Sequence, residues 1–439
     1  MSNIKTSFFD PATVALHSGY QPEPQHGARA VPIYQTTSYA FDDVAHGAAL
    51  FNLERGGHIY SRMTNPTVQV LEQRMAALEG GVACVCTASG MSALFTTFAS
   101  ICSAGDKIVS AAQIYGSTAT LLRSTLQRFG IETVFVDIND HAAVEAALDE
   151  RTKILFCESI GNPGLDVADI PALGAIGDKH GVPLVVDATF ATPMLNNPIA
   201  DGAHVVVHSL TKWIGGSGAA IGGAIIDGGN FDWGAYAARF PTLTEPYAPF
   251  HGINFFEEYG PSALSMRIRA EAMRDFGACL SPQNAFLLLQ GLESLALRMP
   301  QHVSNAQTLA TWLLNQDNVA WVNHPSLSTH PNHALAASLF PKGAGSMLTF
   351  GIKGGRDAGA AFMDALQLAT NLANVGDSRT LVLHPASTTH SRLDAQAMKA
   401  AGIGEDLIRV SVGIESIKDI QADFKQGLKA AAKAVKVLP

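Results

Sequence analysis

A lysine flanked by hydroxyl residues closes the most informative stretch of the chain. Residues 205–207 are three consecutive valines, which indicate a buried strand, and Ser209, Thr211 and Lys212 follow before a glycine-rich turn. An amine walled in by apolar neighbours is costly to keep charged, so its pKa tends to fall. The neutral amine is the form that builds a Schiff base, and short hydroxyl side chains suit a phosphate. Alone, this pattern is more often a surface lysine at the end of a loop.

Two further stretches change that interpretation. The apolar pair 185–186 leads to Asp187, an acid at a strand end about one strand–loop–strand step before Lys212. An aspartate and a lysine at neighbouring strand ends could hold a pyridinium nitrogen and an aldehyde at opposite sides of one ring. Residues 87–95 read as a small-residue turn that opens into an apolar helix. The free N–H groups and the dipole at the start of such a helix favour a phosphate.

With these residues in this order, the sequence resembles the Cys/Met-metabolism family of pyridoxal-phosphate (PLP) enzymes, and within it the O-acetylhomoserine sulfhydrylases. The similarity runs from residues 13–20 to residues 409–415. It implies an α/β protein of PLP-dependent transferase fold type I, with a mainly parallel seven-stranded sheet and a smaller C-terminal α/β domain. The division that it implies is an N-terminal arm at 1–64 contacting a neighbouring subunit, a large PLP-binding domain at 65–270 with an aromatic insertion at 228–260, and a C-terminal domain at 271–439.

The resemblance also implies roles for individual residues. Lys212 becomes the Schiff-base lysine and proton shuttle, and Asp187 keeps the pyridine nitrogen protonated because an adjacent anion favours the charged form. Tyr115 stacks on the ring and serves as an acid–base group at the leaving-group end, although a lone tyrosine in a turn is as often a packing residue. The remaining implied cofactor contacts are Ser89, Gly90, Met91, Ser209 and Thr211 at the phosphate, Asn162 near the 3-hydroxyl, and Tyr60 and Arg62 from the adjacent subunit.

Arg409 is the residue expected to bind the substrate, together with Asn374 and Tyr60. An arginine in so apolar a strand needs a carboxylate, which its guanidinium binds through two hydrogen bonds. A structural salt bridge is the alternative, and the resemblance favours the α-carboxylate of an amino acid. Asn374 stands where the lyases and cystathionine synthases of the family usually carry serine, and Ser117 where the methionine γ-lyases carry cysteine. Both departures favour replacement over elimination.

The resemblance therefore implies γ-replacement in methionine biosynthesis: O-acetyl-L-homoserine and sulfide give L-homocysteine and acetate. Three alternatives stay open: a γ-elimination lyase acting on methionine or cystathionine, an O-succinylhomoserine sulfhydrylase, and a PLP-binding protein without catalysis. A nicotinamide-dependent dehydrogenase is disfavoured, because no G-x-G-x-x-G motif follows the first strand with an acid about 20 residues later.

Length and composition limit the remaining possibilities. A chain of 439 residues predicts two or three domains, and 47% hydrophobic with only 15% charged residues suggests that some apolar surface is covered by partner subunits. The resemblance implies a dimer or tetramer with shared active sites. A net charge of −9 argues against nucleic acid or an anionic membrane as partner. The five cysteines are odd in number and lie in apolar runs without metal-ligand spacing, which predicts reduced thiols, no metal and a cytoplasmic protein. The N-terminus lacks the apolar core of a signal peptide, and no apolar run is long enough to span a membrane.

The elements that must position the site follow from periodicity. Beyond the extended arm, helices alternate with strands, which predicts a parallel sheet covered on both faces, with the site residues at strand ends. The aromatic insertion is expected either to pack on a neighbour or to form a lid over the site. The expected helices are 66–79, 117–129, 169–180, 285–299, 360–369 and 420–437, and the expected strands are 107–110, 132–136, 154–157, 183–186, 204–207, 346–352, 381–383 and 407–412.

Overall fold

A computed structural model of the protein describes residues 10–388 and 404–437. The expectation that the N-terminus carries no signal peptide concerns mainly residues 1–9, which lie outside the described part of the chain. In the part that is described, no helix combines the length and the apolar character needed to cross a membrane.

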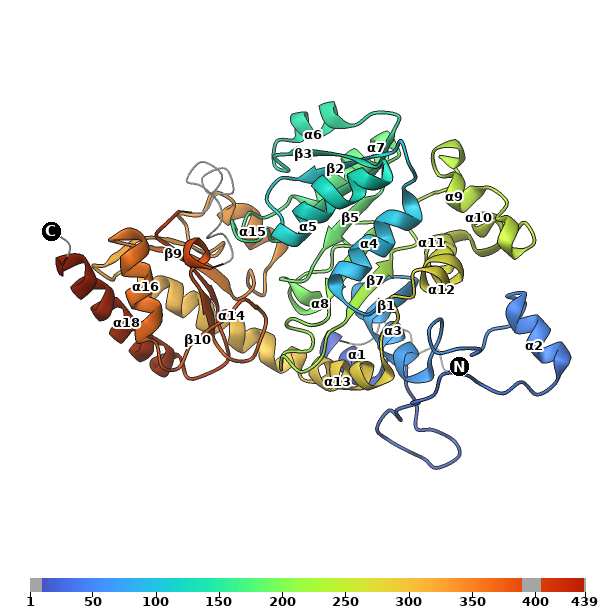
Figure 1. Ribbon diagram of the computed structural model, residues 1–439, viewed down its shortest axis with the longest axis horizontal. Coiled ribbons are helices and arrows are strands. Elements are labelled where there is room, and N and C mark those ends of the chain that lie inside the picture. Colours follow the sequence, from blue (N-terminus) through green and yellow to red (C-terminus); the bar gives the residue numbers. More distant parts are fainter. Residues whose placement is uncertain (1–9, 389–403, 438–439) are drawn as a thin grey trace.

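The sheet of the larger domain has seven strands among the described residues (Figure 1). Their order is β1-β7-β6-β5-β4-β2-β3. The pairs from β3 through β2, β4 and β5 to β6 are parallel, and β7 runs antiparallel to β6 and β1. The expected mainly parallel seven-stranded sheet is therefore confirmed. The strands are β1 Ala83–Thr87, β2 Lys107–Ala111, β3 Glu132–Val136, β4 Thr152–Glu158, β5 Leu184–Asp187, β6 Val205–Ser209 and β7 Gly223–Asp227.

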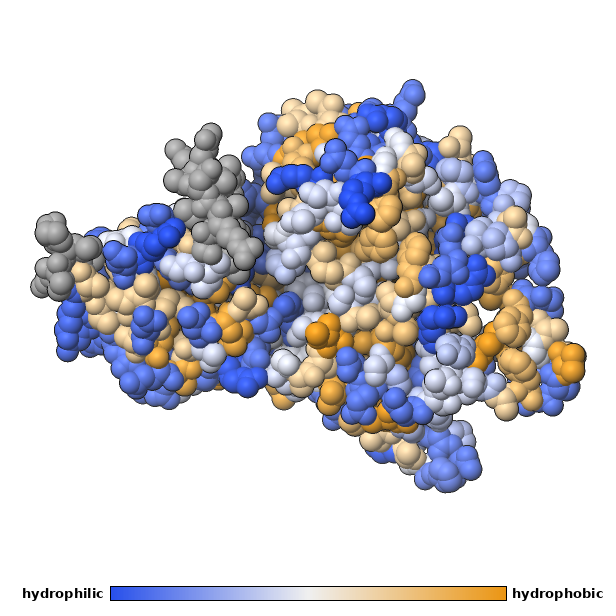
Figure 2. Space-filling view, in the orientation of Figure 1, coloured by the Kyte–Doolittle hydropathy of each residue, from blue (hydrophilic) through white to orange (hydrophobic). Residues whose placement is uncertain are grey.

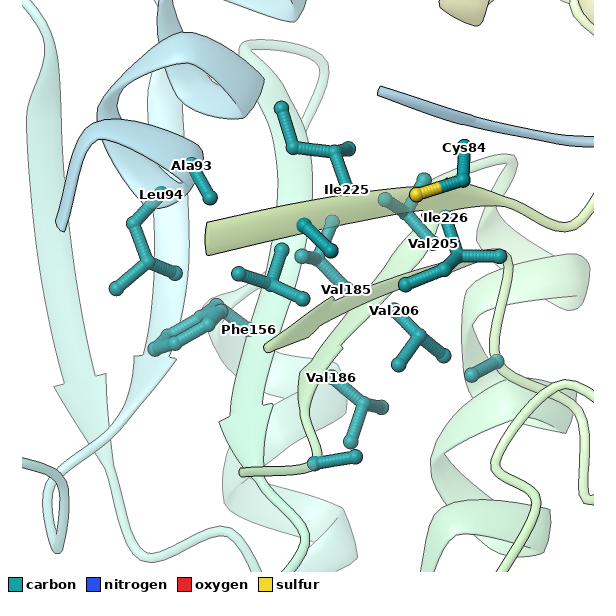
Figure 3. Packing of buried hydrophobic residues seen from close by; sticks show 14 of the residues in the cluster. Cys84, Ala93, Leu94, Phe156, Val185, Val186, Val205, Val206, Ile225 and Ile226 are labelled. Carbon is teal, nitrogen blue, oxygen red and sulfur yellow. The ribbon is translucent and has the colours of Figure 1, made fainter. Parts of the chain in front are cut away.

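The central strands are buried along almost their whole length, and their middle residues are apolar, because helices cover both faces of the sheet. Phe156, Val185 and Val206 are completely buried, and Figure 3 shows them packed together with Leu94 and Ile225 from the flanking elements. Burying each such side chain contributes about 1.5–3 kcal/mol.

The helices around this sheet begin and end at residues that suit the backbone there. Asn65 accepts a hydrogen bond from Thr67 N (2.9 Å) at the start of α3, and Gly181 ends α7 with a φ of 62°. The helical segments of this domain are α1 Pro11–His17, α2 Val44–Phe51, α3 Pro66–Glu79, α4 Gly90–Ile101, α5 Gly116–Thr120, η2 Leu121–Thr125, η3 Leu126–Phe129, α6 His141–Ala147, α7 Ile170–His180, α8 Thr192–Leu195, η4 Ala237–Arg239, α9 Pro241–Thr244, η5 Ala248–Phe250, α10 Phe255–Tyr259, η6 Gly260–Ser262, α11 Ala263–Arg267, η7 Ile268–Ala272, α12 Met273–Asp275 and α13 Pro282–Glu293.

The smaller domain has its own five-stranded sheet, in the order β10-β11-β12-β9-β8. A second core lies against this sheet, where Phe350, Phe362 and Phe424 pack edge to face or tilted. The strands are β8 Val319–Asn323, β9 Met347–Ile352, β10 Thr370–Asn371, β11 Leu381–Leu383 and β12 Leu407–Ser411, and the helical segments are α14 Leu295–Leu313, α15 His333–Leu339, α16 Gly355–Ala365, η8 Pro385–Ser387 and α18 Ile417–Val437.

Several segments differ from the sequence-based expectation: the helix expected over 360–369 is α16, which ends at Ala365, and β7, β8 and α6 were not expected. The helix expected over 117–129 is divided into an α-, a π- and a 3₁₀-segment, so its hydrogen-bond pattern changes twice along the segment. The helix expected over 285–299 is two helices, α13 and α14, that meet at Ser294. The unexpected helix α1 packs its buried Val14 and Ala15 on α3, so it belongs to the core of the larger domain.

The arm between α1 and α3 is irregular except for α2. Val44 is 90% exposed and Phe51 57% exposed, and Figure 2 shows hydrophobic surface over α2 at the right of the view. The aromatic insertion, by contrast, folds onto its own domain, where Phe231, Trp233 and Phe240 form a buried cluster.

Candidate active site

A cavity of about 280 Å³ lies where the carboxyl ends of the parallel strands meet the smaller domain. It has the character of a small-molecule site, with mostly apolar walls and a few convergent polar groups. No residue of the aromatic insertion is among those found to line it. All but two of the predicted site residues line it, namely Ser89, Gly90, Met91, Tyr115, Asn162, Asp187, Ser209, Thr211, Lys212, Asn374 and Arg409.

Lys212 extends into the cavity from the loop after β6. Its Nζ donates a hydrogen bond to Asn374 Oδ1 at 2.6 Å. Burial, and then the positive charge of Arg409, lower the pKa of the Lys212 amine. The loop itself is fixed by Arg298, whose guanidinium donates to the carbonyl oxygens of Trp213 (2.8 Å) and Ile214 (3.1 Å). A lysine with a lowered pKa on a rigid loop is suited to act as a nucleophile and to move a proton.

The start of α4 lies directly against the end of β6. A Cβ atom added at Gly90 would come within 2.6 Å of Ser209 Cβ, so the close approach requires glycine at that position. Ser89 is the N-cap of α4, and its Oγ accepts a hydrogen bond from Ser92 N at 3.1 Å. The Thr211 hydroxyl accepts a hydrogen bond from Gly222 N at 3.1 Å. Helix N–H groups and hydroxyls therefore converge at one end of the cavity, as a phosphate requires.

Asp187 lies at the end of β5, on the wall of the same cavity. Its Oδ1 accepts a hydrogen bond from Thr189 N at 2.9 Å, and the Thr189 hydroxyl accepts one from Ser209 N at 2.9 Å. Burial raises the pKa of Asp187, and the hydrogen bonds from Thr189 oppose that effect. A cation placed against this carboxylate would stabilise its ionised form.

Arg409 reaches the cavity from β12 of the smaller domain. Its Nη1 donates to Asn162 Oδ1 at 3.3 Å, and burial lowers its pKa. Among residues 10–388 and 404–437, no carboxylate forms an ion pair with it, so the structural salt bridge considered as the alternative is not found. A buried guanidinium without a protein counter-ion is suited to bind a ligand carboxylate. Tyr115, which is 44% exposed, lies close enough to Arg409 to oppose the lowering of its pKa by burial.

Tyr60 and Arg62 are the two predicted residues that do not line the cavity. The guanidinium of Arg62 lies 5.3 Å from the centre of the Tyr60 ring, and Tyr60 is 40% exposed. Their placement in a neighbouring subunit's site stays a prediction.

The structure adds cavity residues that the sequence did not single out. Glu158 and Thr189 line the cavity, and Arg298 holds the lysine loop. The strand predicted over 154–157 ends one residue before Glu158, the last residue of the observed strand β4. The end of this strand was therefore predicted almost correctly, but Glu158 was not recognised as a site residue. Arg298 lies far along the chain in a helical run, where the sequence carries no signal for it.

These residues fit PLP by three independent features of the cavity. A phosphate-binding end is formed at Gly90 and Ser209, a buried carboxylate at Asp187 suits the ring nitrogen, and the amine of Lys212 has a lowered pKa. Each lies on an element that the fold brings to the same edge of the sheet.

Comparisons with known proteins agree with this geometry. The profile of a family described as Cys/Met metabolism PLP-dependent enzyme matches residues 12–429. A homocysteine synthase of Schizosaccharomyces pombe is 48% identical over 420 residues, which are 95% of this chain and 98% of the relative. An O-acetyl-L-homoserine sulfhydrylase of Thermus thermophilus is 48% identical over 418 residues, which are 95% of this chain and 99% of the relative.

A solved structure is also similar over nearly the whole chain. It is the crystal structure of a candidate O-acetylhomoserine (thiol)-lyase from Campylobacter jejuni, with a TM-score of 0.92 and 40% identity. The similarity covers 96% of this chain and 100% of that one. The crystal structure contains N'-pyridoxyl-lysine-5'-monophosphate, in which lysine and cofactor are joined.

Proposed function

The chain belongs to the Cys/Met metabolism family of PLP-dependent enzymes, and on that premise we propose that it is an O-acetylhomoserine sulfhydrylase. O-Acetyl-L-homoserine and sulfide give L-homocysteine and acetate, a γ-replacement that serves methionine biosynthesis. The observation that carries the proposal is a single cavity that combines the Lys212 amine, held by Asn374, with the unpaired guanidinium of Arg409. Relatives at this level of identity are named for the same reaction.

PLP supplies an aldehyde that binds the substrate amino group and a ring that accepts electrons from the bond being broken. The cavity residues proposed to hold it are Lys212 at the aldehyde and Asp187 at the ring nitrogen, with Tyr115 against the ring. Asn162 is assigned to the 3-hydroxyl, and Ser89, Gly90, Met91, Ser209 and Thr211 to the phosphate. These assignments rest on the convergence of the residues in one cavity.

Arg409 and Lys212 have separate roles: Arg409 binds the amino-acid substrate, and Lys212 transfers its proton. Arg409 binds the α-carboxylate with its fork and so fixes the orientation of the substrate. Lys212, as the neutral amine favoured by its lowered pKa, takes the proton from the α-carbon and later returns one. Between proton transfers, the side-chain carbonyl of Asn374 accepts a hydrogen bond from the Lys212 amine and fixes its position. Tyr115, at the cavity mouth, is positioned for proton transfer near the departing acetate.

The cavity favours an acetyl over a succinyl ester. Of the cavity-lining residues that the structure describes, two are basic, Lys212 and Arg409. With Arg409 used for the α-carboxylate and Lys212 for the cofactor, neither basic residue found to line the cavity is left to pair with the second carboxylate of a succinyl group. An uncompensated charge against apolar walls is unfavourable.

The assembly proposed is a dimer or tetramer with shared active sites. Tyr60 and Arg62 would complete the phosphate site of a neighbouring subunit, which agrees with their position outside their own cavity. The exposed apolar side chains of α2 are suited to contact with such a neighbour. A cytoplasmic location is also proposed, because the five cysteines are unpaired and four of them are buried.

The function is tested with the purified, PLP-loaded protein and a panel of acyl donors. Homocysteine is measured after mixing with O-acetyl- or O-succinyl-homoserine, each with and without sulfide or methanethiol. The proposal expects sulfide-dependent homocysteine from the acetyl ester, with the succinyl ester a poor substrate. A spectrum unaltered by any acyl-homoserine would instead favour a PLP-binding protein without catalysis.

A further inference from the structure

Glu158 is a buried acid of the cavity to which no role has yet been given. It is the last residue of β4 and lies in register with Asp187 at the end of the neighbouring strand β5. Residues in register on adjacent parallel strands point to the same face of the sheet. Both carboxyl groups accordingly line the cavity.

The two oxygen atoms of Glu158 each accept a backbone hydrogen bond. Tyr115 N donates to Oε1 at 2.7 Å, and Asn162 N donates to Oε2 at 3.1 Å. Both oxygen atoms thus act as acceptors, and the two hydrogen bonds favour the ionised form of the carboxyl group. One side chain therefore joins the loop after β2, which carries Tyr115, to the loop after β4, which carries Asn162.

In the protein without a ligand, burial makes the ionised form of the Glu158 carboxyl group energetically unfavourable. Burial, and then the negative charge of Asp187, raise the pKa of Glu158 well above its usual range. No basic side chain forms an ion pair with it in the described ranges 10–388 and 404–437. A buried acid that holds two loops of a ligand cavity by hydrogen bonds, without an ion-pair partner, is a candidate for a role at that cavity.

We propose that Glu158 is a positioning residue for the cofactor site, which fixes the backbones of Tyr115 and Asn162 on the cavity wall before PLP binds. The hydrogen bond from Arg409 to Asn162 Oδ1 extends the same arrangement to the residue proposed for the substrate carboxylate. The inference requires PLP binding but does not depend on the acyl group or the sulfur donor.

The experiment compares Glu158→Gln and Glu158→Met with the wild type. Glutamine keeps one acceptor and methionine keeps none, at similar side-chain volume. The affinity of the apoprotein for PLP is measured by titration, and the orientation of the bound cofactor by its visible circular dichroism. Because the loops of Tyr115 and Asn162 would no longer be held in place before PLP binds, PLP must order them on binding, and its Kd should rise about 5- to 30-fold in Glu158→Gln, and further in Glu158→Met. The circular dichroism band should weaken in the same order.

Glu72→Gln is the control for a buried glutamate outside the cavity, with the difference that Glu72 Oε2 also accepts a hydrogen bond from Arg269 at 2.9 Å. Glu72 is also a buried glutamate whose Oε1 accepts a backbone N–H, that of Cys86 at 2.9 Å, but it does not line the cavity. This variant should lose thermal stability and keep the PLP affinity and the circular dichroism of the wild type. If Glu158→Gln behaves in the same way as Glu72→Gln, Glu158 is a structural residue only and the proposal is overturned.

A measurement on the wild type covers the case in which the Glu158 variants do not fold. Hydrogen exchange of peptides that contain Tyr115 and Asn162 is followed in the apoprotein. Slow exchange of both amides is expected, since the hydrogen bonds exist before PLP binds. Exchange as fast as in an unstructured peptide would refute the proposal. A failure to form homocysteine would leave these affinities, spectra and exchange rates unaffected, so the two proposals fail separately.

Discussion

At the scale of single residues, the account depends on the amine of Lys212. Burial in the cavity lowers the pKa of this amine, which donates a hydrogen bond to Asn374 Oδ1. Lys212→Ala should lose the visible absorbance of lysine-bound PLP and lower homocysteine formation by about 10³-fold or more, because the lysine both holds the cofactor and moves the proton. Lys179→Ala is the control, since Lys179 forms a surface ion pair with Glu145. A Lys212→Ala protein with an unchanged visible spectrum would refute the assignment.

Asp187 gives a prediction in which stability and cofactor binding change in opposite directions. Burial raises its pKa above the usual 3.8, so the folded apoprotein holds this proton at pH values where the unfolded chain has released it. Stability from this group is thus fully present below the unfolded pKa and is lost as the pH rises through the folded pKa.

Asp187→Asn has no ionisable group at this position, so its stability does not decrease as the pH rises through the pKa of Asp187. The melting temperature of the variant apoprotein should therefore exceed that of the wild type increasingly as the pH rises from 3.8, the usual pKa of an aspartate, through the raised pKa of Asp187 in the folded state. The same variant should bind PLP more weakly, since the charge opposite the ring nitrogen is gone. An apoprotein variant that is less stable than the wild type at every pH would contradict this interpretation.

At the scale of elements, the site forms where the carboxyl ends of the parallel strands lie side by side. The strands that carry the site were predictable because consecutive β-branched residues mark buried strands: Asp187 directly follows Val185 and Val186, and Ser209 and Lys212 come within five residues of Val207. The roles of Arg298 and Asn374 were not predictable from local pattern, because their contacts with the lysine loop join segments far apart in the chain. The helix α1 was missed although an Asp-Pro pair marks its start, since the helix is short and its periodicity weak.

The close packing of α4 on β6 can be tested at Gly90. A Cβ atom there would lie 2.6 Å from Ser209 Cβ and 2.9 Å from Ser209 Cα, so part of the backbone must shift. Gly90→Ala should weaken PLP binding and lower the free energy of unfolding by about 1–3 kcal/mol. Gly56→Ala is the control, since no atom lies within 4 Å of its added Cβ. Equal PLP affinity in the two variants would show that the approach of α4 to β6 is unimportant for the phosphate.

At the scale of the whole molecule, the proposed sharing of sites is tested by complementation. Arg62→Ala and Lys212→Ala chains are each expected to be inactive, and they are mixed after partial denaturation. If the arm of one subunit completes the site of the other, one site in each mixed dimer regains both residues, so up to about a quarter of wild-type activity should return. Mixed dimers that are verified and stay as inactive as either parent would refute shared sites.

The central claim is that the cavity replaces the γ-substituent instead of eliminating it. The most direct measurement is the partition of O-acetyl-L-homoserine between homocysteine and 2-oxobutanoate, followed together in one reaction with sulfide present. Asn374 in place of the serine usual in the lyases, and Ser117 in place of the cysteine of the methionine γ-lyases, predict that homocysteine is the main product and that 2-oxobutanoate is minor. Release of 2-oxobutanoate faster than homocysteine under these conditions would contradict the account and identify a lyase.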